Sequence, residues 1–253
     1  MRFLGILFFL FISVGVFGQK IRFNSSIGSS LISWHESQAT LDLAAGISFQ
    51  NPGKKHKIFV ELKTMGNVSG SPINRSQYTF IEPPVNPRNQ PISPSEELVA
   101  QYRGGQAEAG ISWSSHNKIS LIPSLSFYSK SIARKISSAR SEYIEEEKYS
   151  LHGISAGLGI FIPGKTSLSF QAKIFEPLYE EVTLYGRYVG VPYQSLVSDK
   201  LPNYKLRADV NHGQFGLRLI VEVLNLGGAE NPNSKSIQAS QAIIPSTLLT
   251  YFF

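Results

Sequence analysis

Residues 41–49 read Leu-Asp-Leu-Ala-Ala-Gly-Ile-Ser-Phe, and apolar side chains recur at every second position. Leu41, Leu43 and Ile47 fall on one side of this stretch, whereas Asp42 and the small residues fall on the other. A period of two is typical of a β-strand, because successive side chains point to opposite faces of a sheet. The stretch therefore predicts a strand with one apolar and one polar face.

The same alternation recurs in residues 106–113, 167–174 and 215–224, and no helical period follows residue 18. The chain is therefore predicted to be all-β and antiparallel, with about ten strands. Merging the eighth strand with the ninth would disturb this count, and eight strands is the alternative. The predicted strands are 21–33, 39–50, 57–66, 99–114, 118–135, 143–162, 166–190, 204–210, 214–226 and 241–253.

The connections between these strands alternate in length. Four are tight and rich in turn-forming residues, at 51–56, 115–117, 163–165 and 211–213. The others are looser, near 34–38, 67–98, 136–142, 191–203 and 227–240. Short turns at one end and longer loops at the other are typical of membrane barrels. An even strand count places both termini at the end that faces the periplasm.

The longest predicted loop, 67–98, contains six prolines. Such a density of proline favours extended polyproline-like segments over strand or helix. We expect a docking surface for another envelope protein or a lid over the barrel mouth, with a flexible, variable surface loop as the alternative.

Residues 1–18 have one charge, Arg2, followed by an apolar run and small residues at Gly15 and Gly18. This layout predicts a secretory signal peptide cleaved after Gly18, because the run is shorter than the ~20 residues of a membrane-spanning helix. A retained anchor helix is the alternative. The chain has no cysteine, which excludes a disulfide scaffold. Without Arg2, 23 basic residues face 18 acidic ones, a net charge of +5, and no basic cluster indicates nucleic-acid binding.

The chain ends with Leu249, Tyr251 and Phe253 on one face of the last predicted strand. This ending resembles the terminal signature recognised by the outer-membrane insertion machinery. The whole mature chain, 19–253, resembles the small outer-membrane β-barrel proteins of Bacteroidota. The resemblance implies an outer membrane of a Gram-negative bacterium, with lipid and lipopolysaccharide as neighbours.

Alternation by itself fits either an up-and-down transmembrane β-barrel or a soluble exported β-sandwich, since both have one dry and one wet face. The asymmetric turns and the C-terminal residues favour the barrel. Aromatic residues near strand ends also favour it as interfacial girdles, namely Trp113, Tyr149, Tyr185, Tyr188 and Tyr251.

In such a barrel the polar faces line the lumen, with five basic and six acidic side chains in near balance. A barrel of about ten strands is narrow, so we expect these charges to pair and fill the interior; a narrow channel for small solutes or ions is the alternative. The predicted lumen charges are Asp42, Glu61, Lys63, Glu108, Lys173, Glu181, Arg187, Arg207, Asp209, Arg218 and Glu222.

Few residues suggest other chemistry. His35 and Glu36 are the only neighbouring pair placed as a catalytic pair at the outer rim would be, and they do not complete a triad. In the loop predicted after the fifth strand, Arg134, Lys135 and Arg140 are candidates to bind lipid phosphates, and residues 145–147, all Glu, are candidates to attract divalent cations. An ordinary solvated surface is the alternative. We therefore predict no catalytic residue, metal or cofactor, and a structural or partner-binding outer-membrane component.

Overall fold

The computed structural model describes most of the predicted barrel and the turns at 163–165 and 211–213, whereas most of the predicted turns at 51–56 and 115–117 lies outside the described residues. The predicted signal peptide, most of the 67–98 loop, Arg187 and Tyr188 lie outside the described residues. The described residues are 20–50, 55–67, 70–73, 98–115, 119–138, 141–186, 193–197, 200–228 and 239–253.

The described residues form β-strands that follow the predicted boundaries closely. The strands are β1 (Lys20–Ser33), β2 (Ser37–Gln50), β3 (His56–Gly66), β4 (Ser71–Ile73), β5 (Leu98–Trp113), β6 (Ser120–Ser138), β7 (Ser141–Ile162), β8 (Thr166–Gly186), β9 (Tyr193–Leu196), β10 (Asn203–His212), β11 (Phe215–Leu226) and β12 (Ser240–Phe252).

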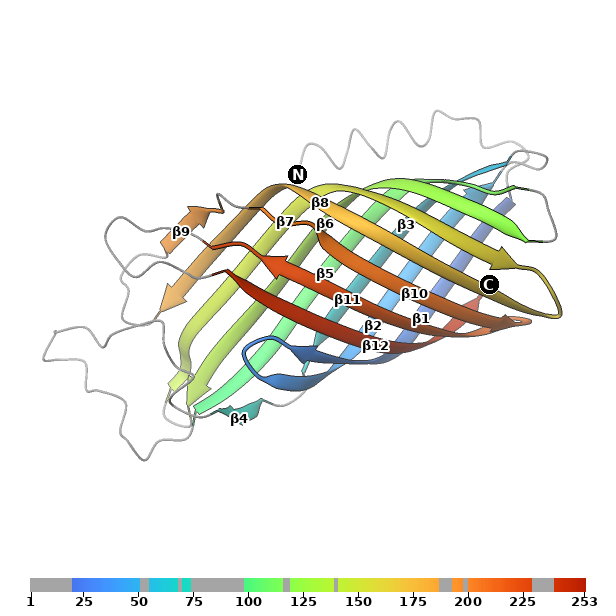
Figure 1. Cartoon of the computed structure of the whole chain (residues 1–253). Coiled ribbons are helices and arrows are strands. Elements are labelled where there is room, and N and C mark those ends of the chain that lie inside the picture. Colours follow the sequence, from blue (N-terminus) through green and yellow to red (C-terminus); the bar gives the residue numbers. More distant parts are fainter. Residues whose placement is uncertain are drawn as a thin grey trace, which may run out of the picture.

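Ten of these strands close into an antiparallel barrel, so the count is ten and not eight (Figure 1). Strands that follow one another in the barrel are hydrogen-bonded neighbours, and the pairings of β12 with β1 and of β8 with β10 complete the ring. The short strands β4 and β9 add to the loop-side ends of β5 and β8. Closure pairs the backbone N–H and C=O groups along the wall and leaves no free sheet edge.

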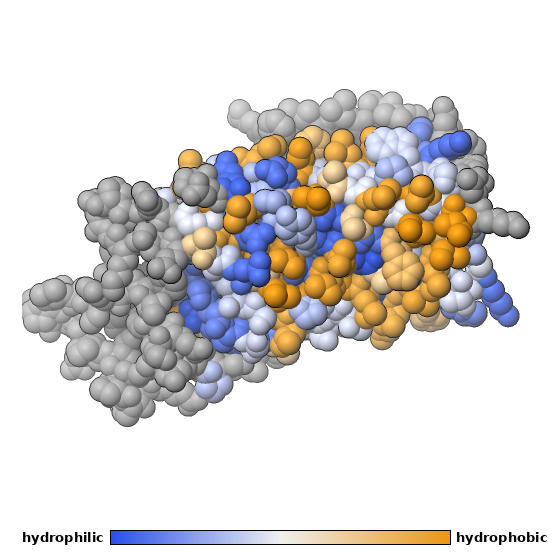
Figure 2. All heavy atoms as spheres, viewed as in Figure 1, coloured by the Kyte–Doolittle hydropathy of each residue, from blue (hydrophilic) through white to orange (hydrophobic). Residues whose placement is uncertain are grey.

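The apolar faces of the strands point outward. Leu43, Phe170 and Leu206 are 47%, 53% and 59% exposed, whereas Asp42, next to Leu43, is fully buried. Figure 2 shows apolar side chains over much of the barrel wall on the face drawn. The predicted β-sandwich alternative is wrong, because these side chains do not meet across two stacked sheets.

The two ends of the barrel differ. The ends of β2, β5, β7 and β10, where the short connections begin, lie at one end, together with the start of β1 and the end of β12. In the β10–β11 turn Gly213 has φ of +60°, a conformation that residues with a Cβ adopt at a cost. We call this end the turn end and the opposite one the loop end. No helix in the described part of the chain has the length and apolar character needed to cross a membrane.

Candidate functional site

The inward faces of the strands place charged side chains in pairs across the lumen. Glu61 on β3 accepts hydrogen bonds from Arg207 on β10 at 3.0 Å and from Arg218 on β11 at 2.9 Å. β3 and β10 lie on opposite sides of the ring. Asp209 accepts from the same two guanidinium groups at 2.7 and 2.8 Å and from Ser169 at 3.0 Å. These side chains therefore span the interior.

A second set of ion pairs crosses the lumen nearer the loop end. The Lys130 ammonium on β6 lies 2.6 Å from Glu222 on β11, and Lys205 lies 3.5 Å from the other oxygen of that carboxylate. Lys173 on β8 pairs with Glu108 on β5. Three intervening strands separate β6 from β11, so this set also links opposite walls.

Asp42 belongs to the same layer. It is fully buried and accepts hydrogen bonds from Ser30 and Thr40, while Lys63 lies 2.9 Å from its carboxylate. Lys63 also donates to Ser246 on β12 at 3.0 Å. We call the whole layer the ion-pair belt. Its members are Asp42, Glu61, Lys63, Glu108, Lys130, Lys173, Lys205, Arg207, Asp209, Arg218 and Glu222.

The belt is stable because its buried charges are paired. A charge without water or a partner is expensive to bury, and loss of one partner from a buried pair costs about 3–5 kcal/mol. Each of the five carboxylates in the belt has at least one cationic partner. The belt therefore closes the middle of the barrel with interactions that do not separate easily.

Between the belt and the loop end the interior is apolar. Side chains from eight strands of the ring meet there in one buried cluster, which we call the apolar plug. Tyr149, Leu151 and Ile244 within it are fully buried. The plug consists of Ile32, Met65, Tyr102, Tyr128, Ile132, Tyr149, Leu151, Phe175, Val182, Val197, Leu224, Leu226, Ala242 and Ile244.

Polar side chains cover the plug at the loop end. Arg134 binds Glu36 through two nitrogens, at 3.0 and 2.9 Å, and His35 lies 3.1 Å from Glu147. Trp34 packs on the ring of His35 with 4.8 Å between centroids. The adjacent residues His35 and Glu36 therefore have different partners and do not act as a pair with each other.

The structure corrects the predicted loop after the fifth strand. Arg134 lies within β6 and is 1% exposed, so its guanidinium faces the interior and does not reach lipid phosphates. Lys135 also lies within β6, and Arg140 is outside the described residues. Residues 145–147 belong to β7, and Glu145 and Glu147 are buried. In the described part of the chain no three metal-ligating side chains cluster together.

One predicted lumen charge, Glu181, is wrong because of a β-bulge in β8. The register of β7 against β8 shifts between His152 and Gly153, and this shift leaves Leu178 as an extra residue. The alternation is inverted beyond this point, so Glu180 is fully buried inside, whereas Glu181 accepts a hydrogen bond from the exposed Tyr179. Arg187, another predicted lumen charge, lies outside the described residues.

The aromatic girdle prediction needs one correction. Tyr149 is fully buried in the apolar plug, because it lies on the inward face of β7. Trp113 and Tyr185 are 42% and 38% exposed on the outer surface, and Tyr188 lies outside the described residues.

The C-terminal residues point away from the lumen. Leu249 and Phe253 are 65% and 71% exposed. The Tyr251 ring lies between Phe215 and Phe253, with centroid distances of 5.3 and 4.8 Å. The three residues of the predicted insertion signature therefore share one outer apolar surface at the turn end.

Two members of the belt were missing from the predicted lumen charges, Lys130 and Lys205. Lys205 alternates with Tyr204 and Leu206, so the period of two in that strand already placed it inside. Lys130 shares its face with Ser126 and Tyr128, and the outer apolar residues of this stretch are too irregular to fix the face from sequence. The apolar plug was also unforeseen, because inward leucines and isoleucines break the polar alternation only locally.

Comparisons with known proteins return likenesses of fold. The outer membrane protease OmpT from Escherichia coli is 12% identical, with a TM-score of 0.49, over 93% of this chain and 94% of that chain. The translocator domain of the autotransporter NalP from Neisseria meningitidis is 10% identical, with a TM-score of 0.45, over 100% and 94%.

The attachment invasion locus protein Ail of Yersinia pestis is 10% identical, with a TM-score of 0.40, over 92% of this chain and 99% of that chain. No protein-family model matches the chain, and no curated protein matches it. With TM-scores below 0.5, these likenesses carry no argument about what the chain does.

Proposed function

We propose that this chain is an integral outer-membrane β-barrel with a closed interior, which acts as a structural or partner-binding component and not as an enzyme. The observation that carries the proposal is that the ion-pair belt and the apolar plug fill successive layers of the lumen. The barrel then presents only its ends and its lipid-facing wall to other molecules.

The outer surface supports a membrane location. Leucine, isoleucine and phenylalanine side chains such as Leu62, Phe127 and Leu158 are 54–66% exposed around the wall. In water this surface would be costly, whereas in lipid it is the favourable arrangement, at about 25 cal/mol per Å² of apolar area removed from water. A closed barrel is also one of the two structures that satisfy every backbone polar group inside a bilayer.

The filled interior supports a non-conducting role over the alternative of a narrow channel. A permeating ion would have to separate pairs such as Lys130–Glu222, at 2.6 Å, and then pass buried rings such as Tyr102 and Tyr149.

The same geometry supports a role without catalysis. Glu36, which adjoins His35 in the sequence, is held by two hydrogen bonds from the Arg134 guanidinium. His35 lies against Glu147 and stacks on Trp34. These contacts assemble a packed cover over the plug.

We expect contacts with other molecules on the outer wall of the barrel and at its ends. We propose that the insertion machinery recognises the outward surface of Leu249, Tyr251 and Phe253, that lipid and lipopolysaccharide surround the wall, and that residues 67–98 contact another envelope protein. Co-purification from native membranes with and without residues 74–97 would identify a partner of that loop. A partner retained equally well by both proteins would contradict the assignment to the loop.

The central test is conductance after reconstitution into planar bilayers. The wild-type protein, identified as folded by a heat-modifiable gel band in the membrane fraction, should be electrically silent. A variant that opens both layers, with Tyr102→Ala and Tyr149→Ala in the plug and Lys130→Ala and Glu222→Ala in the belt, should leak small ions, since neither layer then closes the cross-section. Steady single-channel openings in the wild type would favour the channel alternative instead.

A further inference from the structure

The interior on the turn side of the plug has more positive than negative charge. Eight described cations face it, against five carboxylates. This excess of three belongs to the turn side alone, whereas the near balance expected from sequence refers to the whole lumen. The cations are Arg22, Lys57, Lys63, Lys130, Lys173, Lys205, Arg207 and Arg218, and the carboxylates are Asp42, Glu61, Glu108, Asp209 and Glu222.

Two of the cations have no carboxylate partner in the described structure. The five carboxylates form ion pairs with the six cations of the belt. No described carboxylate lies within ion-pair distance of the Arg22 guanidinium or the Lys57 ammonium. Two of the three excess charges therefore reside on these two side chains, near the turn end of β1 and β3, and the third belongs to the belt.

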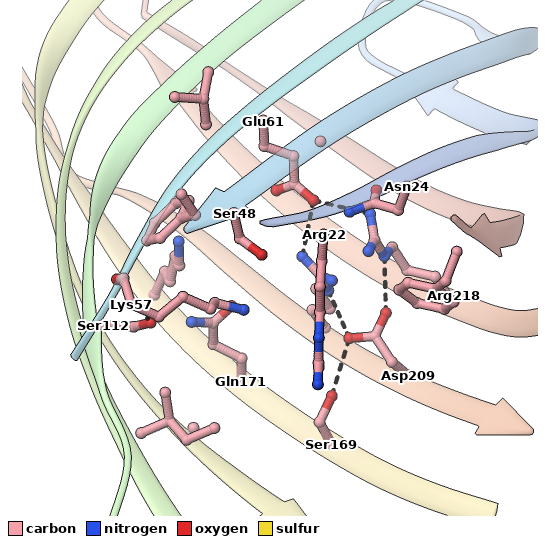
Figure 3. A pocket seen from close by; sticks show the side chains of 18 of the residues that line it. Arg22, Asn24, Ser48, Lys57, Glu61, Ser112, Ser169, Gln171, Asp209 and Arg218 are labelled. Carbon is pink, nitrogen blue, oxygen red and sulfur yellow. Dashed lines mark hydrogen bonds and ion pairs between the residues drawn. The ribbon is translucent and has the colours of Figure 1, made fainter. Parts of the chain in front are cut away.

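Arg22 and Lys57 line a cavity of about 230 Å³ inside the turn end of the barrel. Figure 3 shows them projecting into the same space as Glu61, Asp209 and Arg218. Arg22 is exposed, so the cavity communicates with solvent at this end, while the belt forms its floor.

Small inward residues create the space. Gly46 lies on the wall of the cavity, where an added Cβ would stand 2.8 Å from the Asn24 amide nitrogen. Ser48 and Ser112 line it as well. At about 230 Å³ the cavity is smaller than the ~300–1,000 Å³ of sites for drug-sized molecules. Its occupant is therefore small.

The chemistry of the cavity selects the charge of that occupant. Positive side chains without partners, inside walls of low dielectric, raise the local concentration of anions. The guanidinium of Arg22 and the ammonium of Lys57 offer donors that charge-assisted bonds to oxyanions use. Neutral polar groups of Asn24, Ser48 and Gln171 are placed to bind further oxygens.

We propose that this cavity, which we call the turn-end cup, binds a small polyvalent oxyanion that carries phosphate or carboxylate groups. An excess of three positive charges is better matched by a polyvalent anion than by chloride. Arg22 and Lys57 bind the anion directly. Arg207 and Arg218 remain paired to Glu61 and Asp209 and add to the positive electrostatic potential in the cavity. If the barrel has its termini in the periplasm, as its proposed function implies, the ligand enters from there.

The test is calorimetric titration of the folded barrel in a nonionic detergent at low ionic strength. Pyrophosphate and citrate are the two probes, one for each oxyanion chemistry, and chloride is the monovalent reference. We expect at least one probe to bind with a Kd at least tenfold below that of chloride. Affinity should fall as sodium chloride is raised, since added ions screen the attraction.

The variants Arg22→Gln and Lys57→Gln should each weaken binding about tenfold, because each removes one charge-assisted contact. Lys165→Gln is the matched control: the same change in charge on an exposed lysine of the β7–β8 turn, outside the cup. It should alter the Kd less than twofold. The heat-modifiable band verifies that each variant is folded, and it is independent of binding.

Three results would overturn the proposal. One is a wild-type protein that binds neither probe more tightly than chloride. Another is an equal loss of affinity in Lys165→Gln and Lys57→Gln, which would indicate a general charge effect. The third is full affinity in both cup variants. None of these results bears on conductance. Failure of the anion-binding proposal can therefore be distinguished from failure of the proposed closed barrel, which the conductance measurement tests.

Discussion

The two halves of the barrel interior are built on the same ring of strands but have opposite chemistry. The loop-side half is packed with apolar side chains and carries more carboxylates than cations, since the buried Glu145, Glu147 and Glu180 and the partly exposed Glu36 stand against Arg134. The turn-side half is charged, has an excess of cations and contains a cavity. The same ring of strands therefore encloses two different interiors. The residues that point inward from each strand determine which one forms.

The comparison also separates two ways of closing a lumen. In the plug, closure depends on shape, because fully buried rings and branched chains interdigitate. In the belt, closure depends on pairing, because each buried charge needs its partner. The first tolerates changes of similar volume, whereas the second is destabilised when a change leaves a buried charge without any partner.

The largest effect is expected from breaking the belt. Glu222→Ala removes the partner of Lys130 and Lys205, both of which are at least nine-tenths buried. Because it leaves buried charges unpaired, we expect a loss of about 3–5 kcal/mol in the free energy of unfolding, measured by urea titration in lipid vesicles. Arg103→Ala is the control, since that side chain is 66% exposed where it pairs with Glu146, and it should cost about 0–1 kcal/mol. Equal losses for the two variants would contradict the distinction.

A somewhat smaller effect is expected in the plug. Ile244→Ala should cost about 2–5 kcal/mol, because Ile244 is fully buried and its removal leaves a cavity. Its neighbour Ile243 is 42% exposed on the lipid-facing side of the same strand. Ile243→Ala should cost less, because mobile acyl chains fill the space and only the transfer contribution is lost. Unfolding titrations of both variants in the same vesicles would measure the difference. A greater loss of unfolding free energy for Ile243→Ala would contradict the orientation of β12, in which Ile244 faces inward.

The strands could be predicted from sequence because the wall of a barrel obeys a local rule. Alternation around Leu41 and Phe215, with the asymmetric turns, was sufficient for ten strands and for most of the inward charges. The bulge at Leu178 could not be predicted in this way, since one extra residue has no signature of its own. It exchanges the faces of Glu180 and Glu181 without changing the composition of the strand.

The pairing inside the barrel also lay beyond the sequence. A period of two assigns a side chain to a face but does not choose its partner, and the partners of Glu61 come from strands about 150 residues later. The plug required knowledge of which inward residues share one level around the ring. Leu224 and Ile244 are ordinary members of their strands until β11, β12 and the opposite wall are brought together.

Access of a water-soluble thiol reagent to the interior tests the contrast between the two halves most directly. The chain has no cysteine, so single substitutions report on one position each. Ser48→Cys, in the turn-end cup, should react readily in the folded protein, whereas Ala242→Cys, fully buried in the plug, should react at least about a hundredfold more slowly. Rapid modification of Ala242→Cys in protein that still shows the heat-modifiable band would contradict a closed interior.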